Sequence, residues 1–141
     1  MLEAFGLEAR RSSRISTLSK GMRQKVLITA GLLHDPELIF LDEPLSGLDV
    51  ASTILVKDLI RSLAERGKTI FYCSHMMDVV ERVCDRIVIL GGGKIVADGT
   101  FEELAARSDE QHLEAIFAEL TGGSDSREAV GRILSALDDL R

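Results

Sequence analysis

Two adjacent carboxylates follow an apolar segment near the middle of the chain. Residues 38–41 are Leu-Ile-Phe-Leu, and Asp42 and Glu43 come directly after them. Two like charges at the end of a buried segment are costly unless a positive group lies beside them. A magnesium ion that bridges phosphates would be such a group, with Asp42 holding the ion directly or through water and Glu43 polarising an attacking water. The alternative is that the pair only caps the next turn at the end of a strand.

The segments around this pair alternate between helix and strand patterns. Apolar spacing and short apolar runs bounded by proline or glycine predict, in order, a helix at 19–33, a strand at 37–42, a helix at 51–63, a strand at 69–73, a helix ending at Cys84, and two strands at 86–90 and 94–97 joined by a glycine turn. The first two strands are expected to be buried. This order predicts an α/β fold with a mostly parallel sheet and helices on its faces.

Two capping-box spacings predict further helices after these strands. Thr100 lies three residues before Glu103, and Asp125 lies three residues before Glu128. The last helix has apolar residues at 130, 133, 134, 137 and 140 on one face, so we expect it to dock on another surface.

His75 follows the second predicted strand, as Asp42 and Glu43 follow the first. Ligands of parallel α/β sheets gather at the carboxyl ends of the strands, so we expect the three side chains at one edge of the sheet. A histidine at such a place is, on its own, more often a core or helix-start residue. Beside a nucleotide it would contact the terminal phosphate.

The composition limits the class of protein. The chain has 141 residues, of which 45% are hydrophobic and 28% are charged, as in one globular domain or part of one. No apolar run is long enough to span a membrane, and the N-terminus has no signal-peptide pattern. Cys73 and Cys84 have neither metal-ligand nor disulfide-framework spacing, and we expect both to be reduced core thiols.

Charge is unevenly distributed along the chain. The net charge is −6, yet residues 9–25 contain six basic residues and no acidic one. The segment from Phe101 onward contains ten acidic residues and four basic ones. The basic segment is either a solvated face or a local surface that meets an anion. The acidic balance of the whole chain argues against general nucleic-acid binding.

Four short motifs occur in order: LSKGM at 18–22, LIFLDE at 38–43, SGLD at 46–49 and CSH at 73–75. Together they resemble the motifs of the ATP-binding subunits of ABC transporters, and the stretch CDRIVILGGGKIVADGTFEEL also resembles that family. The resemblance runs from about residue 12 to residue 104. It implies a partial P-loop NTPase fold that ends in a short hairpin and C-terminal helices. It also implies that Glu43 and His75 are catalytic, that Asp42 is the magnesium residue, and that Asp49 belongs to the loop coupling two nucleotide sites.

The segment LSKGM is similar to the signature of the family, usually LSGGQ, which implies nucleotide contacts from residues 19–22. The chemistry of the segment agrees, because Ser19 is an N-cap candidate and the amides of the following turn would form an anion site. Gly21 would let backbone approach closely, and Lys20 replaces a glycine and adds a charge. Met22 replaces a glutamine and fails the capping-box position. It is expected in a core stripe that contains Met22, Val26, Ala30 and Leu33.

Phosphoryl chemistry of this kind needs a glycine-rich loop with a lysine, and these 141 residues do not contain one. The tripeptide at 67–69 fails, because Ser62 stands where a glycine is required and the tripeptide lies between a helix and a strand. In the family this loop precedes the signature, and only eighteen residues precede Ser19. The resemblance therefore implies the C-terminal part of an ATPase domain. We expect residues 1–34 to be the remainder of a helical subdomain, 35–104 the C-terminal part of the ATPase core, and 105–141 a helical extension.

The function implied by the resemblance is that of a partial ATP-binding and ATP-hydrolysing subunit, with ATP and Mg²⁺ as cofactors. It would energise transport through separate membrane permease subunits, and its SKGM variant is similar to efflux-type members. A second ATP-binding subunit would complete a head-to-tail dimer at the cytoplasmic face of the membrane, and no nucleic-acid partner is expected. Two alternatives stay open: a catalytically inert dimerisation or binding module, and a non-transport ABC ATPase.

Overall fold

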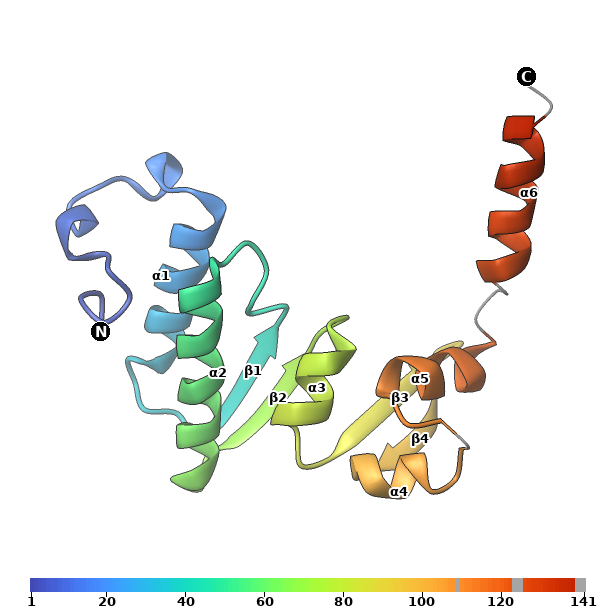
Figure 1. Ribbon diagram of the computed structural model, residues 1–141. Helices are drawn as coiled ribbons and strands as arrows, with labels where there is room; N and C mark the ends of the chain where they lie inside the picture. The colour runs from blue at the N-terminus through green and yellow to red at the C-terminus, as the bar shows by residue number, and fades with distance from the viewer. Residues whose placement is uncertain (109, 123–125, 139–141) are drawn as a thin grey trace. The chain divides into compact units, whose positions relative to one another are not determined.

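The computed structural model describes residues 1–108, 110–122 and 126–138 (Figure 1). The chain divides into two compact units, Met1–Met76 and Met77–Arg141. The four short motifs LSKGM, LIFLDE, SGLD and CSH lie in the first unit, and the stretch from Cys84 to Leu104 lies in the second. The three segments expected from the sequence, with boundaries after residues 34 and 104, stay a prediction.

The first unit contains two short 3₁₀ helices, two α-helices and two strands. Its elements are η1 (Glu8–Arg10), η2 (Ile15–Thr17), α1 (Lys20–Leu32), β1 (Leu38–Asp42), α2 (Val50–Glu65) and β2 (Thr69–Cys73). The expected order of helices and strands is therefore confirmed here. The two strands pair in parallel from Leu38 opposite Thr69 to Asp42 opposite Cys73, so both end at the same edge. The helix between them forms a βαβ unit, as parallel pairing requires.

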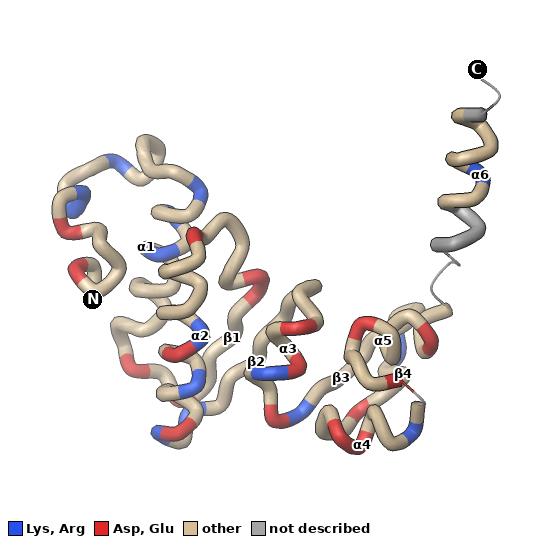
Figure 2. Tube along the Cα trace, viewed as in Figure 1, with Lys and Arg blue, Asp and Glu red and all other residues tan. Residues whose placement is uncertain are grey.

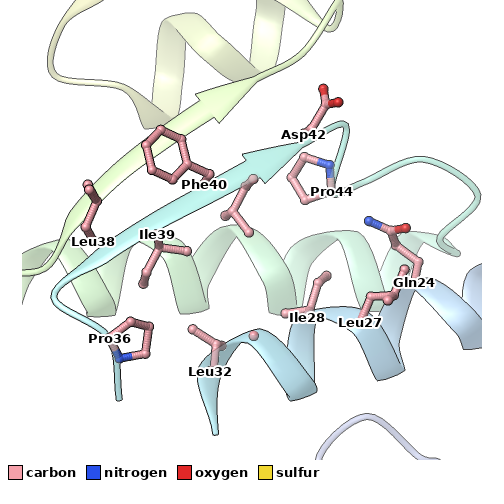
Figure 3. A pocket seen from close by; sticks show the side chains of 12 residues that line it. Gln24, Leu27, Ile28, Leu32, Pro36, Leu38, Ile39, Phe40, Asp42 and Pro44 are labelled. Carbon is pink, nitrogen blue, oxygen red and sulfur yellow. The ribbon is translucent and has the colours of Figure 1, made fainter. Parts of the chain in front are cut away.

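The two strands of this unit are covered on one face only. Ile39 is 7% exposed and, in Figure 3, points toward the side where α1 and α2 lie. On the opposite face Phe40 is 70% exposed and Phe71 is 54% exposed, and their rings stack with centroids 4.9 Å apart. The expectation of two buried strands is therefore wrong for this face. The period of two places every second side chain away from the helices, and no described segment of the unit covers that face.

The buried side of α1 also differs from the expected stripe. Ile28 and Thr29 are its buried residues, whereas Ala30 and Leu33 are exposed and Met22 is half-buried. Apolar spacing gives the helical period, but the covered side depends on which segments pack against the helix. In α2 the buried residues are Ser52, Val56 and Ile60.

The second unit is a β-hairpin with helices packed against it. Its elements are α3 (Met77–Val83), β3 (Ile87–Gly91), β4 (Lys94–Gly99), α4 (Phe101–Ala105), α5 (Leu113–Thr121) and α6 (Ser126–Asp138). Its core is made of Ile87, Ile89, Leu104, Leu113 and Ile116. The strand β3 pairs antiparallel with β4, and in the described chain β1 and β2 form a separate two-stranded sheet. The α/β class is confirmed, but the third strand does not extend the parallel pair. Gly92 and Gly93, both at positive φ, close the hairpin locally.

One of the two expected capping boxes lies among the described residues, at the start of α4. The Thr100 side chain accepts from the Glu103 amide and the Glu103 side chain accepts from the Thr100 amide, so this capping box is confirmed. The other expected box begins at Asp125, which lies outside the described residues, as does Leu140. The remaining apolar residues of the last helix, at 130, 133, 134 and 137, are between 51% and 60% exposed. Their expected docking partner stays a prediction.

The two cysteines differ in their surroundings. Cys84 is half-buried and burial raises its pKa to about 11, as expected for an unreactive core thiol. Cys73 is exposed on β2, so the expectation of a core position is wrong for this residue. None of the helices in the described part of the chain has both the length and the apolar character needed to cross a membrane.

Candidate functional site

The side chains of Glu43 and His75 meet at the carboxyl ends of β1 and β2. Oε1 of Glu43 lies 2.7 Å from Nδ1 of His75 and accepts from the His75 backbone N–H at 2.9 Å. The Ser74 hydroxyl donates to Oε2 of Glu43 at 3.3 Å. The parallel register, with Asp42 opposite Cys73, brings the two segments together. The expected meeting of Glu43 and His75 at one edge of the sheet is therefore observed.

The backbone of Glu43 has an unusual conformation. Its φ is 45°, which is rare for a residue with a side chain. The Glu43 N–H donates to the Cys73 carbonyl at 2.9 Å, and the next two residues, Pro44 and Leu45, are buried. Anchors on both sides thus hold Glu43 in a strained turn. Such strain concentrates at functional sites, where it directs a side chain.

The electrostatics favour an ionised Glu43. The side-chain hydrogen bond from His75, together with the His75 amide and the Ser74 hydroxyl, holds the pKa of Glu43 below its ordinary value, against a smaller opposing effect of burial. Its side chain is 37% exposed, so water reaches the carboxylate. The group is therefore a hydrogen-bond acceptor that can orient a water molecule.

Asp42 lies at the last position of β1 and is exposed. In Figure 3 its carboxylate points away from the apolar side chains that precede it. Within the described ranges it has no hydrogen-bond or ion-pair partner, and no cluster of three or more His, Cys, Asp or Glu residues could hold a metal ion there. A single open carboxylate suits Mg²⁺, which binds through one or two carboxylates together with phosphate oxygens and waters.

The start of α1 is capped as its sequence predicts. The Ser19 side chain accepts from the Met22 amide at 3.2 Å, and its extended backbone (φ −62°, ψ 165°) is that of an N-cap. The first-turn amides of α1 consequently point away from the helix, as an anion site requires. Basic residues occur along the segment before α1 and in its first turns, coloured blue in Figure 2. The exposed ones are Arg10, Arg11, Arg14, Lys20 and Arg23.

Gly21 and Gly47 are in close backbone contact. A Cβ atom at Gly21 would overlap the Gly47 carbonyl oxygen, which no side chain could avoid. Gly47 has φ 76°, and a Cβ there would lie 3.0 Å from Cδ of Lys20. The expected close approach at Gly21 is therefore real, and the approaching backbone belongs to the SGLD segment of the same chain.

Asp49 caps α2 and pairs with α1. Its side chain accepts from the Ser52 amide and the Ser52 hydroxyl, each at 2.8 Å, and lies 3.3 Å from Nζ of Lys25. The hydrogen bonds from the Ser52 amide and hydroxyl, and then the one from Lys25, lower the pKa of Asp49 to about 2. The Lys25 side chain is 14% exposed and that of Asp49 is 63% exposed. Asp49 is thus an ionised link between the two helices.

A separate cavity of about 430 Å³ lies beside α1 and β1 (Figure 3). Apolar residues of both elements line most of it, with Gln24 and Asp42 among its few polar residues. Glu43 and His75 are not part of its lining, so it is not the site where their chemistry would take place.

Sequence reasoning missed three residues of this arrangement. Ser74 stands inside the CSH motif, and the motif itself was the signal that it contacts Glu43. Lys25 contacts Asp49 across 24 residues of chain, and Ser46 contacts Lys20 across 26. No local pattern marks such pairs, because they arise only when α1 packs beside the SGLD segment.

Comparisons with known proteins give one consistent result. Residues 1–46 match a family model described as ABC transporter. An uncharacterised ABC transporter ATP-binding protein of Synechocystis sp. is 39% identical over 139 residues, which are 97% of this chain and 37% of that protein. The Nod factor export ATP-binding protein I of Neorhizobium galegae is 44% identical over 99 residues, 70% of this chain and 28% of that protein. The chain thus spans well under half the length of both relatives.

The fold agrees with these sequence matches. A solved structure of an ATP-binding subunit of an ABC transporter superposes with a TM-score of 0.81 and 34% identity, and the match covers 85% of this chain and 51% of that one. This likeness confirms the expected partial P-loop NTPase fold.

Proposed function

The chain is homologous in sequence and fold to part of the ABC transporter ATP-binding proteins, and we propose that it supplies the signature and the catalytic carboxylate of such a protein. The observation that carries this proposal is the contact of 2.7 Å between Glu43 and His75 at the carboxyl ends of two parallel strands. The capped start of α1, with its signature sequence, supports it independently. The proposed activity is hydrolysis of ATP, coupled to transport through separate membrane permease subunits.

The proposed chemistry assigns one role to each polar group. Bound ATP with its Mg²⁺ ion would supply the phosphoryl group and most of the positive charge. Asp42 would hold the ion, because its carboxylate is exposed and has no partner in the described chain. Glu43 would orient the attacking water through the carboxylate that its lowered pKa keeps ionised.

His75 would link Glu43 to the terminal phosphate. An ionised carboxylate only accepts hydrogen bonds, so Nδ1 of His75 carries the proton that is shared with Glu43. The other ring nitrogen can then donate to a phosphate oxygen only when it also carries a proton. The His75 side chain is 80% exposed, which leaves that nitrogen accessible.

The proposed assembly is a head-to-tail dimer of ATP-binding subunits. In it residues 19–22 would face the nucleotide of the other subunit, and Asp49 would lie in the loop between the two sites. The dimer would act at the cytoplasmic face of the membrane. The name of the Neorhizobium relative describes an exporter, which supports export as the direction of transport.

A second candidate function is a binding module without its own hydrolytic activity. These 141 residues contain no glycine-rich loop with a lysine, which hydrolysis requires. Such a module would pair with a partner that supplies this loop. The third possibility, a non-transport ABC ATPase, has no observation in its favour.

A complementation experiment tests the proposal. The chain is co-expressed with the phosphate-loop half of a relative, and ATP hydrolysis by the purified complex is measured. We expect hydrolysis by the complex and very weak binding of MgATP by the chain alone, because the amide cradle and its lysine are then missing. Tight binding to the chain alone, or a stable complex that binds ATP without hydrolysing it, would contradict the proposal, and the second result would favour the binding module.

A further inference from the structure

Lys20 is tied to the SGLD segment by its whole side chain. Its Nζ donates to Oγ of Ser46 at 2.8 Å, across 26 residues of sequence. Its methylene stem lies over Gly47, since a Cβ built there would come within 3.0 to 3.4 Å of the stem carbons. A lysine stem that packs on a glycine while its head is hydrogen-bonded has far less freedom than a solvated one.

Ser46 belongs to the turn that carries Glu43. The Ser46 amide donates to the Glu43 carbonyl at 3.1 Å, and the Leu48 amide donates to the Leu45 carbonyl at 3.2 Å. Between them Pro44 and Leu45 are buried. A hydrogen bond that restrains the Ser46 side chain therefore also restrains the short turn that begins at Glu43.

The Lys20 head group bonds to a hydroxyl rather than to a carboxylate. Within the described ranges Lys20 forms no ion pair, whereas Lys25 and Lys68 each have carboxylate partners. An ammonium group has three donors and no acceptor, so Ser46 must accept in this bond. The Ser46 Oγ is thereby fixed in position, and the turn from Glu43 to Ser46 is held against the first turn of α1.

We propose that Lys20 is a positioning residue for Glu43, acting through Ser46 and the turn at 43–46. This inference rests on the proposed function, in which Glu43 orients the attacking water. Lys20 would hold the first turn of α1 and the Glu43 carboxylate in a fixed relative position. The Lys20 side chain would then act within its own subunit, while the first-turn amides of α1 face the nucleotide of the other subunit.

Amide hydrogen exchange of the 141-residue chain tests the contact itself. In Lys20→Met we expect the Ser46 and Leu48 amides to exchange roughly three- to tenfold faster, because one hydrogen bond that restrains the turn is lost. The His75 amide, which donates to Glu43, should also exchange faster. Lys20→Arg keeps a donor and should restore protection. Lys57→Met, at a lysine of α2 without a hydrogen-bond or ion-pair partner in the described chain, is the matched control and should change none of these amides.

Kinetics of the complemented ATPase test the consequence for catalysis. In Lys20→Met we expect kcat to fall roughly three- to tenfold with little change in KM for ATP, since a displaced water-orienting group slows chemistry more than binding. Ser46→Ala should give the same loss, and the double variant should lose no more than either single one.

Each outcome bears on a different claim. Unchanged exchange at Ser46, Leu48 and His75 in Lys20→Met would overturn the positioning role, whatever the activity. A loss of activity in Lys20→Met that Ser46→Ala does not share would also overturn it, because Lys20 would then act on the nucleotide directly. A complex without hydrolysis, although Lys20 is native, would contradict the proposed function and leave the exchange result unaffected.

Discussion

The Glu43 carboxylate accepts from both the backbone and the ring of His75, at 2.9 and 2.7 Å, although 32 residues separate them in the chain. The pairing of β1 with β2 produces this contact, because Asp42 and Cys73 are register partners at the ends of the strands. The strained backbone of Glu43 then aims its side chain across to the neighbouring segment.

Replacement of Glu43 by glutamine should separate binding from hydrolysis. In the complemented ATPase, Glu43→Gln should keep nucleotide affinity and reduce turnover by roughly a hundredfold or more, since the amide retains the shape but loses the carboxylate. Steady-state ATPase rates and nucleotide titrations measure the two quantities. Glu65→Gln, at an exposed glutamate at the end of α2, is the control. Unimpaired turnover in Glu43→Gln would disprove the assigned role.

Removal of the His75 ring should reduce turnover less than Glu43→Gln. In His75→Ala the Glu43 carboxylate keeps its hydrogen bonds from the His75 amide and from Ser74 but loses the ring. The carboxyl pKa of Glu43 should therefore rise toward its ordinary value, because the ring hydrogen bond is the main cause of its lowering. Single-turnover kinetics and a carboxyl titration by NMR measure the two effects. An unaltered rate would assign His75 a structural role.

Asp49 should make stability depend on pH in the acid range. Its folded-state pKa of about 2 lies below the ordinary value, so its ionised form stabilises the fold above the unfolded pKa. That contribution is lost as the pH falls from about 4 toward about 2. Urea midpoints of wild type and Asp49→Asn should therefore differ at pH 7 and converge near pH 2. A difference that stays constant across this range would show that ionisation of Asp49 does not matter.

Two glycines of α1 should respond to alanine in opposite directions. Gly21→Ala introduces a Cβ that overlaps the Gly47 carbonyl, which should lower the free energy of unfolding by about 1–3 kcal/mol. Gly31 has no atom within 4 Å of a Cβ position, so Gly31→Ala should raise it by up to about 1 kcal/mol. Denaturant unfolding of both variants measures these changes. Equal responses would show that the backbone contact of Gly21 is absent in solution.

The uncovered face of β1 and β2 should make the isolated chain associate. Phe40 and Phe71 form a stacked, largely exposed pair on strands that normally have both faces covered. Phe40→Glu should therefore shift sedimentation toward the monomer, whereas Ile15→Glu, at an apolar residue that is 63% exposed on η2, should not. Complementation with the phosphate-loop half should have the same effect as Phe40→Glu. A sharp melt of the isolated chain that does not depend on concentration would contradict this expectation.

The sequence by itself determined the local features of this protein. Ser19 and Thr100 cap helices as their spacing predicts, because a cap involves only residues within one turn. The short apolar runs at 38–42 and 69–73 became strands, and two strands joined by a helix must pair in parallel when they are neighbours. The edge that carries Asp42, Glu43 and His75 followed from that order alone.

Tertiary structure decided which faces are covered and which distant side chains meet. Ile39 is buried while Phe40 is exposed, although both belong to the same apolar run, because helices lie on one side of the strand only. Lys20 meets Ser46, and Gly21 meets the Gly47 carbonyl, through the packing of α1 beside a segment about 26 residues away. Such contacts depend on the position of whole elements, which residue spacing along the chain does not encode.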